Sequence, residues 1–516
     1  MTAKTRYDVL SSDRSQYLRV AEDAAKLTIP YLIHQDDNTT GHRNLTTPWQ
    51  GVGAKGVVTL ASKLMLALLP PQTSFFKLQV DDTMLGEIGP EIKSELDLSF
   101  AKIERTILDS IAASDDRVVV HQALKHLVVA GNALIYMGKE GLKLYPLNRY
   151  VVDRDGDGNV IEIVTKESIS KKIIEDLVPN LHTEDISQHS DDDTEDCDVY
   201  THVRVEGKRV IWHQEVYDLI IPKSPGKAPL NATPWLPLRF NTVDGEGYGR
   251  GRVEEFIGDL KSLEALSQAL VEGSAAAAKV VFTVSPSSTT KPATLAKAGN
   301  GAIVQGRPDD IGVVQVGKTA DFQTAYNMVQ QLERRLSEAF LILSVRQSER
   351  TTAEEVRLTQ MELEQSLGGL FSLLTVEFLV PYLDRKLNVF QKTGKIPRIP
   401  DGIVHPTIVA GINSLGRGQD RESLGMFLQT IAQTMGPEAL QAFINPEEVV
   451  KRLAAASGID VLNLVKSMEE IQGEQQQQQQ QQMAMQEQQN TPALAAVGQK
   501  QLQAEMEMAQ QQQPPQ

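Results

Sequence analysis

The stretch TTAEEVRLTQMELEQSLGGLFSLLTVEFLVPYLDRKLNVF, residues 351–390, has the clearest helical pattern in the sequence. Its apolar residues recur mostly at three- and four-residue steps, and its charged residues fall largely elsewhere, which is typical of an amphipathic helix. Thr352 and Glu355 form a capping-box pattern at its start. A helix over residues 353–380 would be about 40 Å long. The apolar stripe consists of Val356, Leu363, Leu367, Leu370, Leu374, Phe378 and Tyr382.

Two features interrupt this long helix. Gly368 and Gly369 lie in its middle, where each costs about 1 kcal/mol relative to alanine. Pro381 removes a hydrogen bond to the preceding turn. The pattern therefore predicts a long core helix that bends at Gly368 and Gly369.

The length, composition and net charge of the chain limit the classes of protein to which it can belong. The 516 residues suffice for several domains, and 41% are hydrophobic while 23% are charged. A net charge of −16 argues against a surface that wraps nucleic acid. With Cys197 alone, the sequence offers neither a disulfide framework nor a cysteine metal cluster, which favours a reducing compartment. No segment resembles a signal peptide or a membrane span, so we expect a cytosolic product.

Helical and strand-like patterns alternate along the chain. Short strands dominate residues 142–240, which predicts a β-rich subdomain with a solvated acidic loop, HSDDDTEDCD, at residues 189–198. Strand-like runs also occupy residues 280–318. The tail from residue 474 is dominated by glutamine and is expected to be disordered. Helices are predicted at residues 6–30, 48–69, 90–113, 118–130, 252–279 and 321–343 and, in short pieces, over 420–471.

The segment DGEGYGRG, residues 244–251, predicts a hinge before the helix at residues 252–279. It could in principle cradle a phosphate at a helix start, but it lacks the Lys-Ser/Thr ending of a P-loop. The glycines of this hinge are Gly245, Gly247, Gly249 and Gly251.

Two other motifs favour structure over ligand binding. GVGAKG, with Gly51, Gly53 and Gly56, matches a dinucleotide pattern but lies inside a helical pattern, so close helix packing is the better interpretation. DRDGDGNVIEIV, residues 153–164, resembles a calcium loop, but its twelfth position is Val164 and not glutamate. A β-hairpin turn is therefore favoured there.

The sequence has no recognisable catalytic motif and no histidine or cysteine motif that binds a metal. The nine histidines lack paired metal-ligand spacing, and Cys197 in an acidic loop would have a raised pKa. We therefore expect no catalytic residue, metal or cofactor, and no enzyme activity.

Several phrases together resemble one family, the portal or head-tail connector proteins of short-tailed podoviruses of the autographivirus type. The phrases are collinear and span about residues 47–420. They are TPWQGVGAKGVVTLASKLMLALLP, ALKHLVVAGNALIY, GEGYGRGRVEEFIGDLKSLEAL, GRPDDIGVVQVGKTADF, TAEEVR with SLGGLFSLL, and GINSLGRGQD.

The resemblance implies an α+β, mainly helical, portal-type fold that assembles as a ring, usually of twelve copies, with wing, stem, clip and crown. Carried onto this sequence, the resemblance makes residues 1–244 the wing and residues 352–392 a long bent helix that also belongs to the wing. The stem helices would be residues 245–279 and 319–343, with the clip between them at residues 280–318 and the channel (tunnel) loop after them at residues 344–351. The crown would be residues 393–473, and the Gln-rich tail residues 474–516.

The resemblance also implies partners and a location. The ring would lie at one capsid vertex of the virion, after assembly in the host cytoplasm, and would not insert into a membrane. Double-stranded DNA would pass through its channel during genome packaging and ejection. Its protein partners would be the terminase large subunit, a tail adaptor protein, scaffolding protein, major capsid protein and internal core proteins.

The channel residues follow from this assignment. Duplex DNA carries about one negative charge per 1.7 Å, so a conduit in which it slides should avoid strong basic attraction. Our hypothesis is that Arg346 and Arg350 touch phosphate intermittently, while the channel wall is kept repulsive by acidic residues. These are Glu354, Glu355 and Glu362. An ordinary solvated loop and helix face is the alternative for each of them.

Two other functions remain open on the sequence. One is an enzyme that acts on nucleotides through a glycine-rich segment, and the other is a monomeric helical adaptor. Native mass or negative-stain imaging would separate a closed ring from both.

Overall fold

The computed structural model describes residues 1–34, 45–70, 75–80, 90–170, 196–277, 281–299, 301–314, 319–342, 369–397, 404–408 and 417–436, with the isolated residues 449, 502 and 504. The chain divides into two compact units, residues 1–414 and 415–516. Within these described ranges the fold is mixed and mainly helical, which confirms that part of the predicted fold class.

The first part of unit 1 is helical. Its helices are α1 (Ala3–Lys26), α2 (Val52–Leu68), α4 (Pro90–Ala112) and α5 (Asp116–Ala130). The central helix is α5, whose second half is almost entirely buried. It ends at Gly131, where φ is 73°, a left-handed conformation that glycine adopts readily.

Antiparallel sheets form the β-rich subdomain that the sequence predicted. A three-stranded sheet has the order β10-β2-β3, and a six-stranded sheet has the order β4-β5-β6-β7-β8, with β9 also pairing with β7. β1 (Phe76–Val80) pairs separately with β13 (Val404–Ile408). The other strands are β2 (Asn132–Met137), β3 (Leu142–Tyr145), β4 (Tyr150–Arg154), β5 (Val160–Ser170), β6 (Asp196–Glu206), β7 (Arg209–Val216), β8 (Leu219–Ile220), β9 (Gly226–Pro229) and β10 (Trp235–Arg239).

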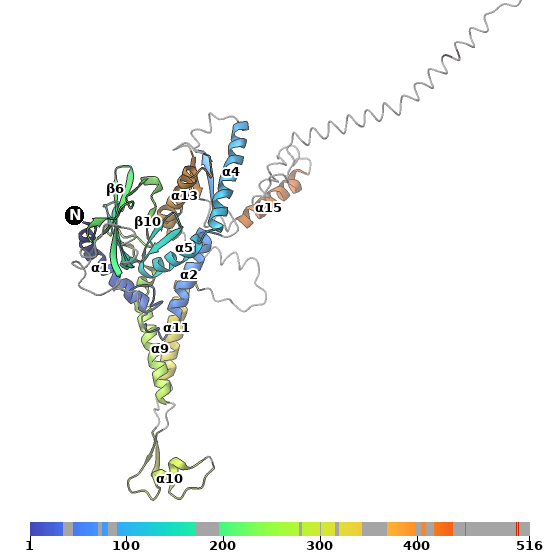
Figure 1. Ribbon diagram of the computed structural model, residues 1–516. Coiled ribbons are helices and arrows are strands. Elements are labelled where there is room, and N and C mark those ends of the chain that lie inside the picture. The colour runs from blue at the N-terminus through green and yellow to red at the C-terminus, as the bar shows by residue number, and fades with distance from the viewer. Residues whose placement is uncertain are drawn as a thin grey trace, which may run out of the picture. The chain divides into compact units, whose positions relative to one another are not determined.

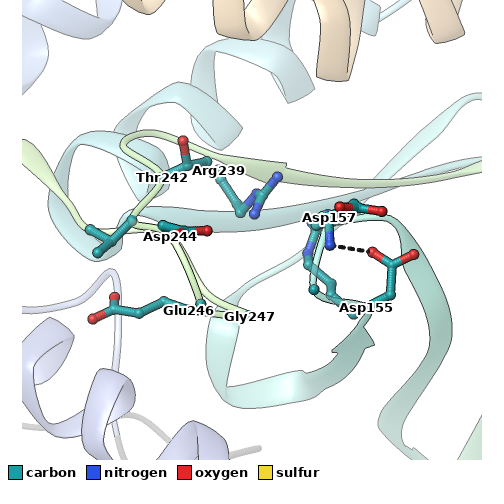
Figure 2. Close-up of a pocket in the computed structure, with 12 residues that line it drawn as sticks. Asp155, Asp157, Arg239, Thr242, Asp244, Glu246 and Gly247 are labelled. Carbon is teal, nitrogen blue, oxygen red and sulfur yellow. Dashed lines mark hydrogen bonds between the residues drawn. The ribbon is translucent and has the colours of Figure 1, made fainter.

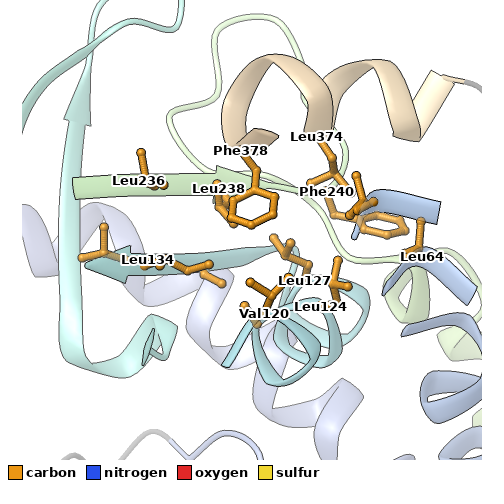
Figure 3. Close-up of a cluster of buried hydrophobic side chains, with 14 of the residues drawn as sticks. Leu64, Val120, Leu124, Leu127, Leu134, Leu236, Leu238, Phe240, Leu374 and Phe378 are labelled. Atoms are coloured by element: carbon orange, nitrogen blue, oxygen red, sulfur yellow. The ribbon is translucent and has the colours of Figure 1, made fainter. Parts of the chain in front are cut away.

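A large hydrophobic cluster joins the helices to the smaller sheet (Figure 3). Leu124 and Leu127 of α5 face Phe240, which follows β10, and Phe378 approaches from the other side. All four side chains are almost fully buried. This core holds elements that are far apart in the sequence in one unit.

A helical excursion follows the sheets. After the short α8 (Arg252–Glu255), α9 (Ile257–Ala277) leads to β11 (Val281–Val284), α10 (Pro292–Lys297) and β12 (Ile311–Val314), and α11 (Thr319–Ala339) returns. β11 and β12 pair with each other. In Figure 1, α9 and α11 lie side by side. The two predicted helices with strands between them are therefore present.

The C-terminal part of the long predicted helix contains an irregular turn. Residues 369–374 are helical, Thr375–Leu379 form a π-helical turn, and α13 (Val380–Lys392) continues from it. The Val380 N–H bonds to the carbonyl of Thr375, five residues back. This turn directly precedes Pro381, which lacks an N–H and cannot complete the regular α-helical ladder. The predicted bend at Gly368 and Gly369 stays a prediction, because Gly368 lies outside the described residues.

Two local predictions have clear outcomes. Residues 153–164 form the β4–β5 hairpin, with Asp155 accepting hydrogen bonds from the backbone N–H groups of Asp157 and Asn159, so the turn interpretation is confirmed. The placement of Cys197 in an acidic loop is wrong. Cys197 lies on β6, which begins at Asp196, and its side chain is buried against Val199, Val216 and Ile221. The acidic residues around Cys197 suggested a solvated loop, but the strand has already begun there.

In the second unit the structure describes α15 (Arg417–Met435), close to the helix predicted from residue 420. The remaining predicted crown helices and the glutamine-rich tail lie outside the described residues, apart from isolated positions.

Candidate functional site

The predicted channel residues lie outside the part of the chain that the structure describes. This holds for Arg346, Arg350, Glu354, Glu355 and Glu362. The structure does describe how the chain is fixed on both sides of residues 343–368, which contain all of them. These two fixed ends, together with the α9–α11 pair, make up the candidate site.

On the N-terminal side, the end of α11 is fixed to α2. The ring of Phe340 lies against Gly56, where a Cβ atom would come within 2.7 Å of it. Lys63 of α2 donates a hydrogen bond of 2.5 Å to the carbonyl of Leu341, and burial lowers the pKa of this lysine. The interpretation of GVGAKG as a close-packing motif is confirmed.

On the C-terminal side, an ion pair fixes the π-helical turn to β10. Glu377 accepts hydrogen bonds from the Arg239 backbone N–H at 2.8 Å and from its side-chain Nε and Nη2 at 2.9 and 2.6 Å. Both side chains are largely shielded from solvent. Because one carboxylate binds both backbone and side chain of Arg239, it fixes the position and the orientation of the turn.

A second buried carboxylate fixes α13 to the start of α5. Asp116 is 1% exposed and accepts hydrogen bonds from the Tyr382 hydroxyl at 2.5 Å and from Lys386 Nζ at 2.8 Å. Burial and the adjacent Asp116 charge raise the pKa of Tyr382 well above its ordinary value. Asp116 lies in the first turn of α5, where the helix dipole favours a negative charge. No sequence pattern indicated this cluster, because Asp116 and Tyr382 are 266 residues apart.

The α9–α11 pair has a narrow apolar seam and polar outer faces. Leu260, Leu263 and Leu336 are fully buried, and Val329 is nearly so. Further along, Gly273 is so close to the Phe322 ring that a Cβ atom would lie 2.5 Å from it. Arg335 of α11 pairs with Asp259 of α9 at 2.5 Å. Small residues on α9 thus allow the two helices to approach closely.

The glycine-rich segment that leads into this pair is tightly packed at one end only. A Cβ on Gly249 or Gly251 would lie 2.7 or 2.6 Å from a carbonyl oxygen, whereas Gly245 and Gly247 have open space around them. Asn132 binds the carbonyl and the N–H of Gly249. The hinge stays a prediction, and this packing restricts it to the Gly245 and Gly247 end.

A cleft of about 520 Å³ lies between this segment and the β4–β5 turn (Figure 2). Arg154 and Arg239 line it together with carboxylates from both segments. The carboxylates are Asp155, Asp157, Asp244 and Glu246. Because acidic groups outnumber the arginines, and Arg239 already binds Glu377, the cleft does not favour a phosphate. Among the described residues, no cluster of His, Cys, Asp and Glu is placed to hold a metal ion.

A polar network that no sequence motif indicated attaches α1 to the large sheet. Arg6 pairs with Glu162 at 2.6 Å and with Asp153 at 2.9 Å, and Glu162 also contacts His202. Burial lowers the pKa of His202, and its hydrogen bond with Glu162 opposes that effect. The network joins the N-terminal helix to the sheet and lies apart from the candidate site.

Residues 1–462 match the family described as bacteriophage head to tail connecting protein. The chain belongs to this family. A head to tail connecting protein has a structural role, which agrees with the expectation that the chain is not an enzyme.

The relatives of this connecting protein include the portal proteins of Enterobacteria phage T3 and Escherichia phage T7. They are 39% and 38% identical to it, over 91% of this chain and 89% of theirs. The portal protein of Enterobacteria phage SP6 is 30% identical over 91% of this chain and 90% of its own. The resemblance to podovirus portal proteins is thereby confirmed.

A solved structure of the neck of an empty GTA particle aligns with the connecting protein at a TM-score of 0.41 and 12% identity, over 80% of this chain and 90% of that one. This score is too low to support a conclusion. Within the described residues, no helix has both the length and the apolar character needed to cross a membrane.

Proposed function

We propose that this connecting protein forms a ring-shaped conduit for double-stranded DNA at one vertex of the capsid. The conduit serves genome packaging, retention and ejection, and it is the platform on which the tail attaches. The observation that carries the proposal is the antiparallel α9–α11 pair, which bears a small β unit at one end and leads into residues 343–368 at the other.

The parts of the chain then take the roles expected of a portal-type fold. Residues 1–244 and 352–392 form the wing, α9 and α11 form the stem, and residues 280–318 form the clip. Residues 344–351 form the channel loop, and residues 393–473 form the crown. The fixation of α11 to α2 and of α13 to α5 supports this assignment, because a loop that contacts moving DNA needs rigid attachments on both sides.

The charge of the chain supports a conduit for sliding DNA. At −16 the protein as a whole repels phosphate, and the two arginines of the channel loop supply local attraction. Arg346 and Arg350 hold the DNA intermittently in this account, and Glu354, Glu355 and Glu362 keep the channel wall repulsive.

The proposed partners follow from the same roles. The clip meets the terminase large subunit and later the tail adaptor, while the wing and crown meet scaffolding protein, major capsid protein and the internal core proteins. The ring is a closed homo-oligomer of about twelve copies.

The double variant Arg346→Ala/Arg350→Ala tests the channel role. We expect rings of normal size with impaired DNA packaging or retention, measured by nuclease-protected DNA per particle. A control variant, Arg19→Ala/Lys139→Ala, removes the same charge from exposed positions in the wing and should package normally. Normal packaging and retention in the channel variant would contradict the assigned role of the two arginines.

A further inference from the structure

One end of the large sheet carries a group of exposed cations. The β6–β7 hairpin and the adjoining strand β9 present Arg204, Lys208, Arg209 and Lys227, which we call the basic tip. Within the described part of the chain, none of the four has an ion-pair partner. The exposed Leu230 lies beside them, because its backbone N–H donates a hydrogen bond to the carbonyl of Lys208. The tip therefore combines unpaired positive charge with an exposed apolar side chain.

A group of carboxylates lies at the other edge of the same sheet. They line the cleft between the β4–β5 turn and residues 242–247 (Figure 2). We call this group the acidic corner, and it consists of Asp155, Asp157, Asp244 and Glu246. Asp157 and Asp244 are exposed, and among the described residues neither forms an ion pair. Val243 is exposed next to Asp244, so the corner also combines unpaired charge with an apolar side chain.

The strand register places both groups at the same end of the sheet. The β4–β5 turn lies at the start of β5, and the β6–β7 turn lies at the end of β6. Glu162, near the start of β5, is opposite Arg204, near the end of β6, so the two turns are neighbours. The strand order β4-β5-β6-β7, with β9 beyond β7, then separates the groups sideways. Four steps of about 4.8 Å put β4 and β9 about 19 Å apart, on opposite edges.

We propose that the basic tip of one subunit contacts the acidic corner of its neighbour in the ring. The inference rests on the proposed ring and names a contact within it. Two different surfaces on opposite edges of a subunit make a head-to-tail interface, the kind that closes a ring when it repeats with rotation. Opposite charges favour this pairing, and like charges oppose a contact of two tips or of two corners.

The exposed apolar side chains indicate a protein partner for the tip. Protein interfaces combine apolar contact with a polar rim, and Leu230 on the tip and Val243 on the corner supply the apolar part. Glu206 lies opposite Arg209 in register, within the tip, and would meet the phosphates of a nucleic acid unfavourably. The acidic corner of a second copy meets both requirements.

Cross-linking in the full-length chain tests the contact directly. The double variant Leu230→Cys/Val243→Cys places one thiol in each surface, while the native Cys197 is buried. With a short bis-maleimide, this variant should form covalent chains longer than dimers, because every subunit offers one thiol to each neighbour. Each single variant and the unaltered chain should stay monomeric on a denaturing gel, because their neighbours then share no pair of thiols.

Charge reversal tests the electrostatic part of the same contact. One variant reverses the tip with Lys208→Glu/Arg209→Glu, and another reverses the corner with Asp157→Lys/Asp244→Lys. Asp155 is left unchanged, because it accepts the hydrogen bonds that close the β4–β5 turn. In sedimentation measurements, each variant should raise the concentration needed for half-assembly about tenfold. A chain that carries both reversals should regain assembly, because its tip and corner are again of opposite charge.

A matched control separates the contact from the overall charge. Arg19→Glu/Lys139→Glu changes the net charge as much as the tip variant does, at exposed positions outside the tip, and should assemble normally. Impaired assembly of this control to the same extent would show that net charge, and not the contact, governs assembly.

The outcomes distinguish this contact from the ring itself. Rings of the double-cysteine variant that yield no covalent chains, or reversals that do not rescue each other, overturn the contact and leave the ring intact. Dimers from either single-cysteine variant overturn it as well, because they require a surface to meet itself. An unaltered chain that forms no ring overturns the proposed function and the contact together. Duplex DNA that binds the unaltered ring but not the tip variant, in the absence of cross-links, assigns the tip to nucleic acid instead.

Discussion

At the scale of single residues, Asp116 is a polar side chain that lies buried where α5 meets α13. Its carboxylate is almost completely buried and is bound by both Tyr382 and Lys386. Burying a charge costs free energy unless partners compensate for it, and here a cation and a hydroxyl do so. Removing the carboxylate leaves both partners without their acceptor.

The variant Asp116→Ala should therefore lower the free energy of unfolding by about 3 kcal/mol, because it leaves the Lys386 charge uncompensated beside the core. Chemical denaturation followed by circular dichroism measures this. Asp109→Ala, at an exposed position on α4, is the matched control and should change the value by less than about 0.5 kcal/mol. Equal effects of the two variants would show that the buried cluster does not fix α13.

His126 makes stability depend on pH. It lies buried in α5, and its burial lowers its pKa from 6.5 to about 4. Because the unfolded chain binds the proton more tightly, the stability from the neutral ring is fully present above about pH 6.5 and is lost as the pH falls toward 4. Between pH 7 and pH 5 this loss should be about 2 kcal/mol, and His126→Leu should remove it. Denaturation midpoints of both proteins at the two pH values measure the difference, and parallel pH profiles would contradict it.

Residue contacts were the least predictable feature of the sequence. Gly56 was correctly interpreted as a packing position, but nothing local indicated that its partner is Phe340. The pairing of Arg6 with Glu162 spans 156 residues and carries no periodic signal. Such contacts arise from the tertiary fold, so a pattern within one window cannot contain them.

At the scale of elements, two helix attachments define the ends of the undescribed residues 343–368. α11 packs onto α2 through Phe340 and Gly56, and the π-helical turn with α13 is held by Arg239 and Asp116. Pro381 accounts for the irregular turn, and the sequence did indicate a lost hydrogen bond there. It did not indicate the π-helical form, and no local pattern indicated that Glu377 in this turn binds Arg239 of β10.

Gly56→Ala should weaken the attachment of α11 to α2. The added methyl group would lie 2.7 Å from the Phe340 ring, so the two helices must separate, at a cost of about 1–3 kcal/mol in the free energy of unfolding. Gly258→Ala, on α9 with nothing within 4 Å, should instead be neutral or stabilise the protein by up to about 1 kcal/mol. Thermal unfolding of the two variants separates these expectations. A destabilised Gly258→Ala with an unaffected Gly56→Ala would contradict the packing account.

The order of helices and strands was largely predictable, because amphipathic periods and turn residues are local signals. The β4–β5 hairpin shows the strength of such signals, since Asp155 and Gly158 specify its turn within a few residues. Cys197 shows their limit, because the acidic residues around it concealed the start of β6.

At the scale of the whole molecule, the proposed function rests on the family to which the chain belongs, on its net charge and on the arrangement of two helices. The chain belongs to the head to tail connecting proteins, carries a net charge of −16, and places helices α9 and α11 side by side with a small β unit between them in sequence. Collinear phrases over residues 47–420 were enough to indicate the family from the sequence. The composition alone was not, because it suits many soluble proteins.

The most direct test of the central claim is the mass of the purified full-length chain by native mass spectrometry. The account predicts a closed assembly of about twelve copies of the 56.8 kDa chain, with a single discrete stoichiometry. A chain that stays monomeric at micromolar concentration would contradict the ring and, with it, the proposed DNA conduit.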